Sequence, residues 1–127
     1  MTVAEIHVWQ VLEAWAAAVR AADVDVLLAL HTDDVVLFDV VPPFAVRGAS
    51  DYLERWRPFW QAQGRGQCDV SRLTVVAGED VAHAHGPLRV GPAGGEGFDV
   101  RLTVGLRRVE GRWLISHEHH SVPAAPA

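Results

Sequence analysis

The sequence has no lysine, a single cysteine and no long apolar run, and each absence argues against a class of protein. All 11 basic residues are arginines, and 16 acidic residues outnumber them, which gives a net charge of −5. With no basic run besides, this balance argues against a nucleic-acid partner. Cys68, being alone, forms neither an intrachain disulfide nor a thiolate metal cluster. No apolar stretch approaches the roughly 18 residues that indicate a membrane span.

Targeting segments, repeats and a second domain are not indicated either. Glu5 stands where a signal peptide would have basic residues, so we expect a cytoplasmic protein. Residues 123–127, Pro-Ala-Ala-Pro-Ala, form a short tail with nothing to bury. The chain has 127 residues, half of them apolar, which suits one folded domain that we place at residues 1–122.

Helical patterns occupy the first half of the chain. Thr2 and Glu5 form a capping-box pattern before a helix whose apolar residues recur at spacings of three and four. Asp23 is placed to cap a second, short helix. A third helix is predicted after Gly48. Pro58 lies inside it and removes an amide hydrogen, so we expect a kink or an early end there.

Strand patterns dominate the second half, where apolar residues alternate with polar ones. The predicted strands are 35–41, 67–77, 80–90, 98–108 and 112–121. Helices followed by a meander of strands indicate an α+β fold with helices on one face of a sheet.

The last strand ends in an unusual polar cluster. Because successive side chains on a strand point to opposite faces, its polar residues divide into two groups. One face receives Ser116, Glu118 and His120, and the other receives His117, His119 and Ser121. A buried acid beside imidazoles is costly unless the groups are paired or used. The strand therefore either lines a polar cavity or exposes one face to solvent.

Three segments together resemble a known family. They read A-A-D-V-D-V-L-L-A-L-H-T-D-D-V-V-L-F-D, R-G-A-S-D-Y-L and E-G-R-W-L-I-S-H-E-H-H-S. In this order, residues 3–122 resemble the nuclear transport factor 2-like superfamily, closest to its SnoaL-like and ketosteroid isomerase-like branch. The resemblance implies a cone in which a curved antiparallel sheet wraps the N-terminal helices, in the order α-α-β-α-β-β-β-β. It also implies a deep pocket between sheet and first helix, and dimers through the outer sheet face.

The resemblance suggests roles for individual residues. The isomerases use an Asp on the first strand as the proton-shuttling base, and Asp39 falls at the matching position. Their two oxyanion-hole donors, a Tyr and an Asp, correspond here to Trp15 and Thr103. Neither replacement is a strong acid, so steroid isomerisation itself is not expected.

The family register also points one face of each of the last two strands into the pocket. The residues concerned are Asp99, Arg101, Thr103, Leu114, Ser116, Glu118 and His120. Arg101 and Glu118 would then form a buried ion pair near Asp39 and His120, and Arg101 could bind an anionic group. The candidate catalytic residues are Asp39, His120, Glu118 and Arg101. The candidate ligand-binding residues are Trp15, Tyr52, Trp56, Trp60, Thr103 and Ser116.

Each candidate has a structural alternative. Asp39 could bond turn amides before Pro42, and the Arg101–Glu118 pair could be purely structural. His120 could be a hydrogen-bonded wall residue. The tryptophans at helical spacings are mostly core residues, one or two of which could wall a ligand pocket.

The same register places an apolar row on the outer sheet face. Trp113 and Ile115 would lie there with His117 and His119, and such patches seldom stay exposed. We therefore expect a homodimer with Trp113 and Ile115 in or near the contact. The expected ligand is a small hydrophobic molecule, and neither a nucleic acid nor a membrane is expected as a partner.

Three functions are compatible with the sequence. The first is a cofactor-independent isomerase, cyclase or dehydratase that transfers a proton on a hydrophobic carbonyl compound, through Asp39 or an Asp39–His120 pair. The second is a non-catalytic ligand-binding or dimerisation module of the same fold. The third is a metal site built from two H-x-H pairs, His83 with His85 and His117 with His119. Our preferred interpretation is the first, with no metal ligand and no cofactor.

Overall fold

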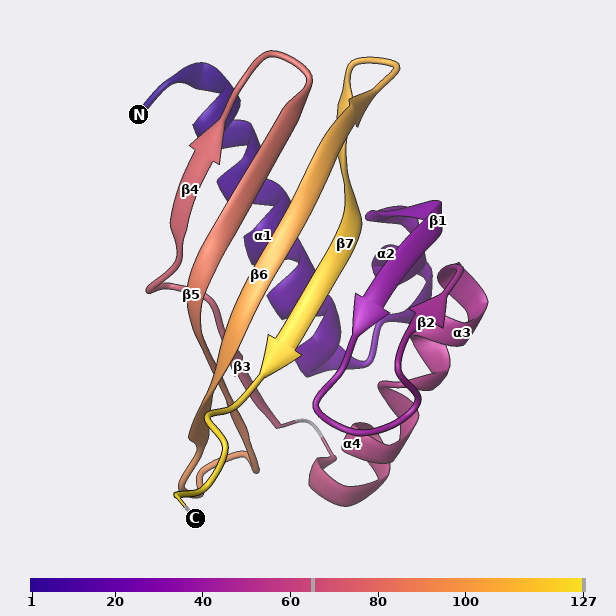
Figure 1. The fold of residues 1–127 in the computed structure, drawn as a ribbon, viewed down its shortest axis with the longest axis vertical. Coiled ribbons are helices and arrows are strands. Elements are labelled where there is room, and N and C mark those ends of the chain that lie inside the picture. The colour runs from indigo at the N-terminus through magenta and orange to yellow at the C-terminus, as the bar shows by residue number, and fades with distance from the viewer. Residues whose placement is uncertain (65, 127) are drawn as a thin grey trace.

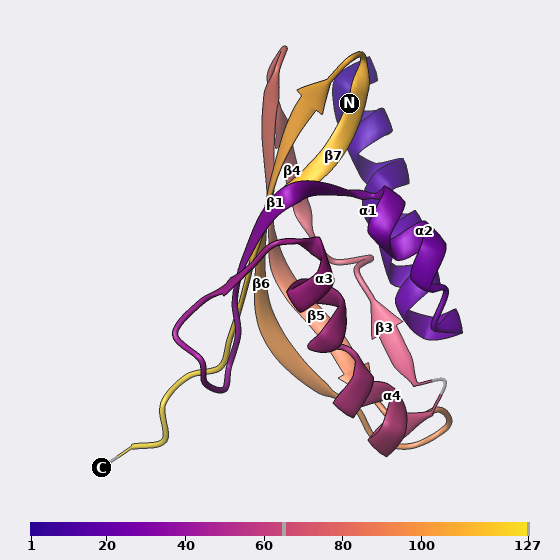
Figure 2. The ribbon, with the colours of Figure 1, turned by 90° about the vertical axis from the view of Figure 1, so that its right-hand side faces the viewer.

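A computed structural model describes residues 1–64 and 66–126, and it shows a curved sheet with the helices on one face (Figures 1 and 2). The elements in chain order are α1 (Val3–Ala21), α2 (Val24–Ala29), β1 (His31–Phe38), β2 (Val46–Arg47), α3 (Ala49–Glu54), α4 (Arg57–Gln63), β3 (Gln67–Asp69), β4 (Thr74–Ala77), β5 (Val81–Gly91), β6 (Phe98–Val109) and β7 (Arg112–Ser121). The predicted α+β fold class is confirmed.

Local side-chain hydrogen bonds start the first two helices. The Thr2 hydroxyl accepts the Glu5 amide at the start of α1 and donates to the Glu5 carboxylate. Asp23 accepts the Val26 amide at the start of α2. Both caps satisfy amides that have no partner inside a helix, as the sequence predicted.

The third predicted helix is two helices, α3 and α4. Pro58 lies in the first turn of α4, where the amide that it lacks is not needed. The expected break is confirmed, because α3 ends at Glu54 and α4 starts at Arg57. The Trp60 indole on α4 donates to the Val19 carbonyl, 2.9 Å away, which ties α4 to α1.

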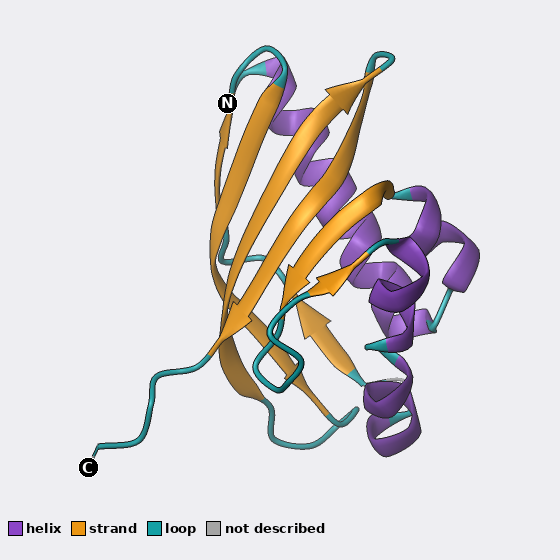
Figure 3. Ribbon diagram, turned by 45° about the vertical axis from the view of Figure 1, so that its right-hand side comes forward, coloured by secondary structure: helices purple, strands orange, loops and turns teal. Residues whose placement is uncertain are grey.

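The sheet has the strand order β2-β1-β7-β6-β5-β3, with β4 also paired to β5 (Figure 3). The pairs among β5, β6 and β7 are antiparallel, but β1 pairs with β7 in parallel. The expectation of a wholly antiparallel sheet is therefore wrong at this one pair. No hairpin connects β1 to its neighbour β7. The chain enters β1 directly from α2, and the β1–β7 pair is parallel.

A β-bulge in β7 changes which residues face the helices. Gly105 pairs with His117 and Leu106 pairs with Ile115, so Ser116 is an extra residue in β7. The Ser116 hydroxyl donates to the Gly105 carbonyl, 3.3 Å away. An extra residue shifts the alternation by one position, so odd-numbered residues before the bulge and even-numbered residues after it face inward.

Because of the bulge, the first residues of β7 face the side opposite to the one that the sequence predicted. Trp113 and Ile115 are buried on the inner face together with Glu118 and His120. The prediction that Trp113 and Ile115 lie on the outer face near a dimer contact is wrong. Only the inward direction of Glu118 and His120 was predicted correctly, because these residues follow the bulge.

β6 also presents a different face to the helices than the family register implied. Its buried residues are Val100, Leu102, Val104 and Leu106, and its exposed residues include Asp99, Arg101, Thr103 and Arg107. This orientation buries the apolar row and leaves the charged row in water, where no unpaired charge has to be desolvated. The prediction that Arg101 and Thr103 point into the pocket is wrong.

Shortening Ile115 tests the reversed alternation before the bulge. Ile115→Ala removes a fully buried side chain and should lower the free energy of unfolding by about 2–5 kcal/mol. Thr103→Ala on the outer face is the control and should cost about 1 kcal/mol or less. Urea denaturation measures both changes, and equal costs would contradict the orientation described here.

Candidate functional site

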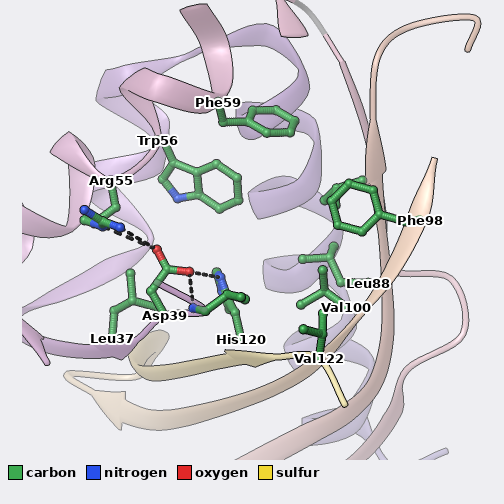
Figure 4. A pocket seen from close by; sticks show the side chains of 12 residues that line it. Leu37, Asp39, Arg55, Trp56, Phe59, Leu88, Phe98, Val100, His120 and Val122 are labelled. Carbon is green, nitrogen blue, oxygen red and sulfur yellow. Dashed lines mark hydrogen bonds and ion pairs between the residues drawn. The ribbon is translucent and has the colours of Figure 1, made fainter. Parts of the chain in front are cut away.

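A cavity of about 230 Å³ lies between the α3–α4 segment and the inner face of the sheet (Figure 4). Most of its wall is apolar, formed by Leu37, Val40, Trp56, Phe59, Leu88, Val90, Phe98, Val100 and Val122. Its polar end is formed by three residues, Asp39, Arg55 and His120. The cavity thus has an apolar body and one chemically functional end, which is typical of small-molecule sites.

Asp39 lies just past the end of β1, where its carboxylate meets several partners. Oδ1 accepts the Val40 amide at 2.7 Å, and Oδ2 accepts Nε and Nη2 of Arg55 at 3.3 and 3.2 Å. His120 Nδ1 lies 3.8 Å from Oδ1 on the pocket side (Figure 4). Both carboxylate oxygens therefore already accept hydrogen bonds, and His120 is the second functional group of this end.

Glu118 lies behind His120 and is completely buried. Its Oε1 is 3.0 Å from His120 Nε2, and its Oε2 is 2.6 Å from His31 Nε2. The other ring nitrogen of His31, Nδ1, is 2.7 Å from the Leu27 carbonyl oxygen. A chain of hydrogen bonds thus runs from the end of α2 through His31 and Glu118 to the pocket-lining His120.

The histidines keep Glu118 ionised despite its burial. Burial alone raises the pKa of a carboxyl group, but the hydrogen bonds from His120 and His31 and their charges outweigh this effect. Together they lower the pKa of Glu118 from 4.5 to about 2. An ionised carboxylate only accepts hydrogen bonds, so His120 Nε2 must donate to Oε1. The Nδ1 atom of a neutral His120 then presents a lone pair toward Asp39 and the cavity.

Tyr52 connects the aromatic side chains of the site to Glu118. Its hydroxyl accepts the indole N–H groups of Trp15 and Trp56, at 2.9 and 3.0 Å. Burial and the negative charge of Glu118 raise the pKa of Tyr52 well above its ordinary value. Tyr52 therefore stays neutral and fixes Trp56, which forms part of the cavity wall.

The structure brings together some of the predicted site residues and separates others. Asp39, His120 and Trp56 line one cavity, and Glu118 contacts it through His120. Arg101 and Thr103 do not belong to this site, because β6 turns them to the outer face. The predicted buried pair of Arg101 with Glu118 does not exist. The histidines take the place of Arg101 as partners of Glu118.

The remaining predicted ligand-binding residues lie outside the cavity wall. Trp15 and Tyr52 are fully buried behind it, where they hold Trp56. Trp60 bonds the backbone of α1, and Ser116 bonds the backbone of β6 at the bulge. None of these four residues lines this cavity, and a role for them in ligand binding stays a prediction.

Sequence reasoning missed two members of the site, Arg55 and His31. Arg55 stands three residues after Tyr52, on the same side of the helical turn, which is a usable signal. His31 gives no such signal, because its partner Glu118 is 87 positions away in the sequence. Only the parallel pairing of β1 with β7 brings the two residues together.

The two H-x-H pairs do not form a metal site. Within residues 1–64 and 66–126, no group of three or more His, Cys, Asp or Glu side chains is arranged to hold a metal ion. The rings of His83 and His85 stack nearly parallel with centroids 5.9 Å apart, and His117 Nδ1 is hydrogen-bonded to the Val36 carbonyl. Among the described helices, none is long and apolar enough to cross a membrane.

Comparison with known proteins agrees with this architecture. Residues 8–125 match the family described as the SnoaL-like domain. The chain belongs to this family. A crystal structure of an NTF2-like protein of unknown function from Pseudomonas putida KT2440 is 35% identical, with a TM-score of 0.88. The match covers 98% of this chain and 90% of that one. No curated protein sequence matches.

More distant solved structures share the fold alone. One from Streptomyces avermitilis, whose name proposes a dehydratase, is 18% identical with a TM-score of 0.77, covering 94% of this chain and 95% of that one. Another, from Thiobacillus denitrificans ATCC 25259, carries a name that proposes a calcium/calmodulin-dependent protein kinase type II association domain. It is 19% identical with a TM-score of 0.74, covering 90% and 93% of the two chains. Proteins of this fold thus carry both enzyme names and association-domain names. The function has to be argued from the site and not from the fold.

Replacing Glu118 should change how stability depends on pH. Its pKa is lowered in the folded protein, so its ionised form stabilises the fold above about pH 4.5, and this contribution is lost as the pH falls toward about 2. Glu118→Gln cannot titrate and lacks this dependence. The stability difference between wild type and variant should shrink by an amount on the order of 3 kcal/mol across this range. Denaturant titrations at several pH values measure it, and a difference independent of pH would contradict the ionised, histidine-paired Glu118.

Proposed function

We propose that the protein is a cofactor-independent enzyme of the isomerase, cyclase or dehydratase type, which transfers a proton on a small hydrophobic carbonyl compound. The observation that carries this proposal is the setting of His120. Its Nε2 is held by a buried carboxylate, while its Nδ1 is directed at Asp39 in a largely apolar cavity. A histidine oriented in this way by a buried acid is a typical general base.

His120 is the better candidate for the proton acceptor, and Asp39 is its partner. The Asp39 oxygens are engaged by Val40 and Arg55, whereas His120 Nδ1 has a lone pair for a substrate proton. When Nδ1 takes up that proton, the imidazolium lies between the charges of Asp39, 3.8 Å away, and Glu118, 3.0 Å away. Both carboxylates stabilise this charged state, so the Asp39–His120 pair acts as a unit.

The cavity also indicates what kind of substrate it accepts. The negative charge of Asp39 and the positive charge of Arg55 offset each other in their ion pair. A ligand with its own net charge would find no unpaired partner at this end, so we infer a neutral ligand with an apolar body. Arg55 bonds Asp39 through Nε and Nη2. Its guanidinium is therefore fixed at the cavity wall, where it can stabilise negative charge on a carbonyl oxygen.

Proton transfer is testable before the natural substrate is known. Small apolar ketones in D₂O are incubated with the protein, and exchange of C–H for C–D beside the carbonyl is followed by NMR. His120→Gln should slow the enzyme-dependent exchange by about two orders of magnitude or more, the usual size of a general-base contribution. Asp39→Asn should slow it as well, with the fold preserved. Arg101→Gln, on the outer face, is the control and should exchange at the wild-type rate.

The result for each variant separates the alternatives. Full exchange in His120→Gln together with loss in Asp39→Asn would make Asp39 the base. If no variant changes the exchange rate and only the affinity for the ketones changes, the protein is a ligand-binding module and the enzymatic proposal is wrong.

We also propose a homodimer through the outer sheet face. The outer sides of β5, β6 and β7 carry no helix (Figure 2), and His85, Thr103 and His119 lie side by side there in register. A two-fold contact between two such faces would leave neither sheet face exposed. Light scattering should therefore show a dimer at neutral pH. A monomer at micromolar concentration and neutral pH would contradict the proposal.

A further inference from the structure

At the buried end of the hydrogen-bond network, His31 and Glu118 share more protons than a neutral histidine beside a carboxylate would carry. His31 Nδ1 faces the Leu27 carbonyl at 2.7 Å, and a carbonyl oxygen only accepts, so Nδ1 carries a hydrogen. His31 Nε2 faces Glu118 Oε2 at 2.6 Å, and a second hydrogen must lie between these two atoms. His31 and Glu118 therefore hold two protons between them, and both side chains are fully buried.

The second proton belongs to His31 rather than to Glu118. Both oxygens of Glu118 face a histidine Nε2, at 2.6 and 3.0 Å, and an imidazole is ordinarily a stronger base than a carboxylate. The pair is thus an imidazolium and a carboxylate, a charge pair that satisfies itself inside the core. The ring of Tyr52 packs against His31, with centroids 4.2 Å apart, and closes the site on the side of α3.

We propose that His31 is a positioning residue, which donates to Glu118 and thereby keeps the pocket-facing Nδ1 of His120 free of a proton. With His31 in place, Glu118 is ionised and can only accept from His120 Nε2. The proton of a neutral His120 is then confined to Nε2. The catalytic consequence rests on the proposed function, but the position of this proton is a property of the ligand-free protein.

Removal of the His31 donor should reverse the arrangement. A buried Glu118 that has lost the hydrogen bond donated at position 31 is more costly to keep ionised, so it takes up a proton. A neutral Glu118 can donate its hydroxyl to His120 Nε2. The His120 proton then moves to Nδ1, where Asp39 accepts it, and no lone pair is left for a substrate. Burial raises the pKa of Tyr52 on α3 well above its ordinary value and that of Cys68 to about 12, so both stay neutral in either arrangement. Arg55 is ion-paired with Asp39.

Two replacements of His31 separate hydrogen bonding from packing. His31→Gln retains an N–H donor that reaches toward Glu118, whereas His31→Leu fills the space without a donor. Nitrogen-15 NMR of the imidazole side chains, recorded on the full ligand-free chain near neutral pH, reports which ring nitrogen of His120 carries hydrogen. We expect Nε2–H in the wild type and in His31→Gln, and Nδ1–H in His31→Leu. Nδ1–H in the wild type, or Nε2–H in His31→Leu, would overturn the proposal.

A second readout distinguishes positioning from simple stabilisation. Ketone exchange by His31→Leu should fall roughly 10²-fold in kcat with little change in KM, and His31→Gln should recover most of that loss. If His31→Leu does not fold, the wild-type spectrum and the His31→Gln kinetics decide: Nδ1–H on wild-type His120, or a His31→Gln rate as low as that of His120→Gln, refutes the role. If the protons lie as expected but His120→Gln exchanges normally, the proposed function fails and the inference about His31 stands.

Discussion

The ionised carboxylate of Glu118, buried without solvent contact, is the interaction on which the rest of the site depends. A bare carboxylate in this position would cost several kcal/mol of desolvation. His31 and His120 each donate to one of its two oxygens, so both oxygens are hydrogen-bonded. The bond from His31 joins the start of β1 to β7, and the bond from His120 lies within β7. The second bond also determines which ring nitrogen of His120 is available to the cavity.

A second set of hydrogen bonds, among aromatic residues, holds the apolar wall of the cavity. Trp15, which is fully buried on α1, bonds Tyr52, and Tyr52 in turn holds the Trp56 indole in the cavity wall. The apolar wall and the polar end are therefore positioned by one continuous network. This network would hold the base in one orientation before a ligand binds, as the proposed proton transfer requires.

Sequence periodicity predicted the fold class well, because helical and strand patterns are local. The caps at Thr2 and Asp23 also bond amides only three residues away. Periodicity predicted the site only in part. Asp39 and His120 were placed correctly beside the same cavity. Arg101 was not, because the choice of face for β6 depends on which row of side chains the helices bury. That choice favours Val100 and Leu102 over charged neighbours. Because of the bulge at Ser116, the side chains at the start of β7 face the opposite side from the one predicted. The alternation of residues along a single strand does not reveal a bulge. His31 could not be found, since its partnership with Glu118 exists only through the parallel pairing of β1 and β7.

Neutron diffraction can show whether the buried Glu118 holds His120 with its Nδ1 lone pair toward the cavity. In a crystal of the deuterium-exchanged wild-type protein near neutral pH, we expect deuterons on both ring nitrogens of His31 and on Nε2 of His120, with none on Glu118. A deuteron on His120 Nδ1 combined with a bare Nε2, or one bonded to a Glu118 oxygen, would contradict this arrangement.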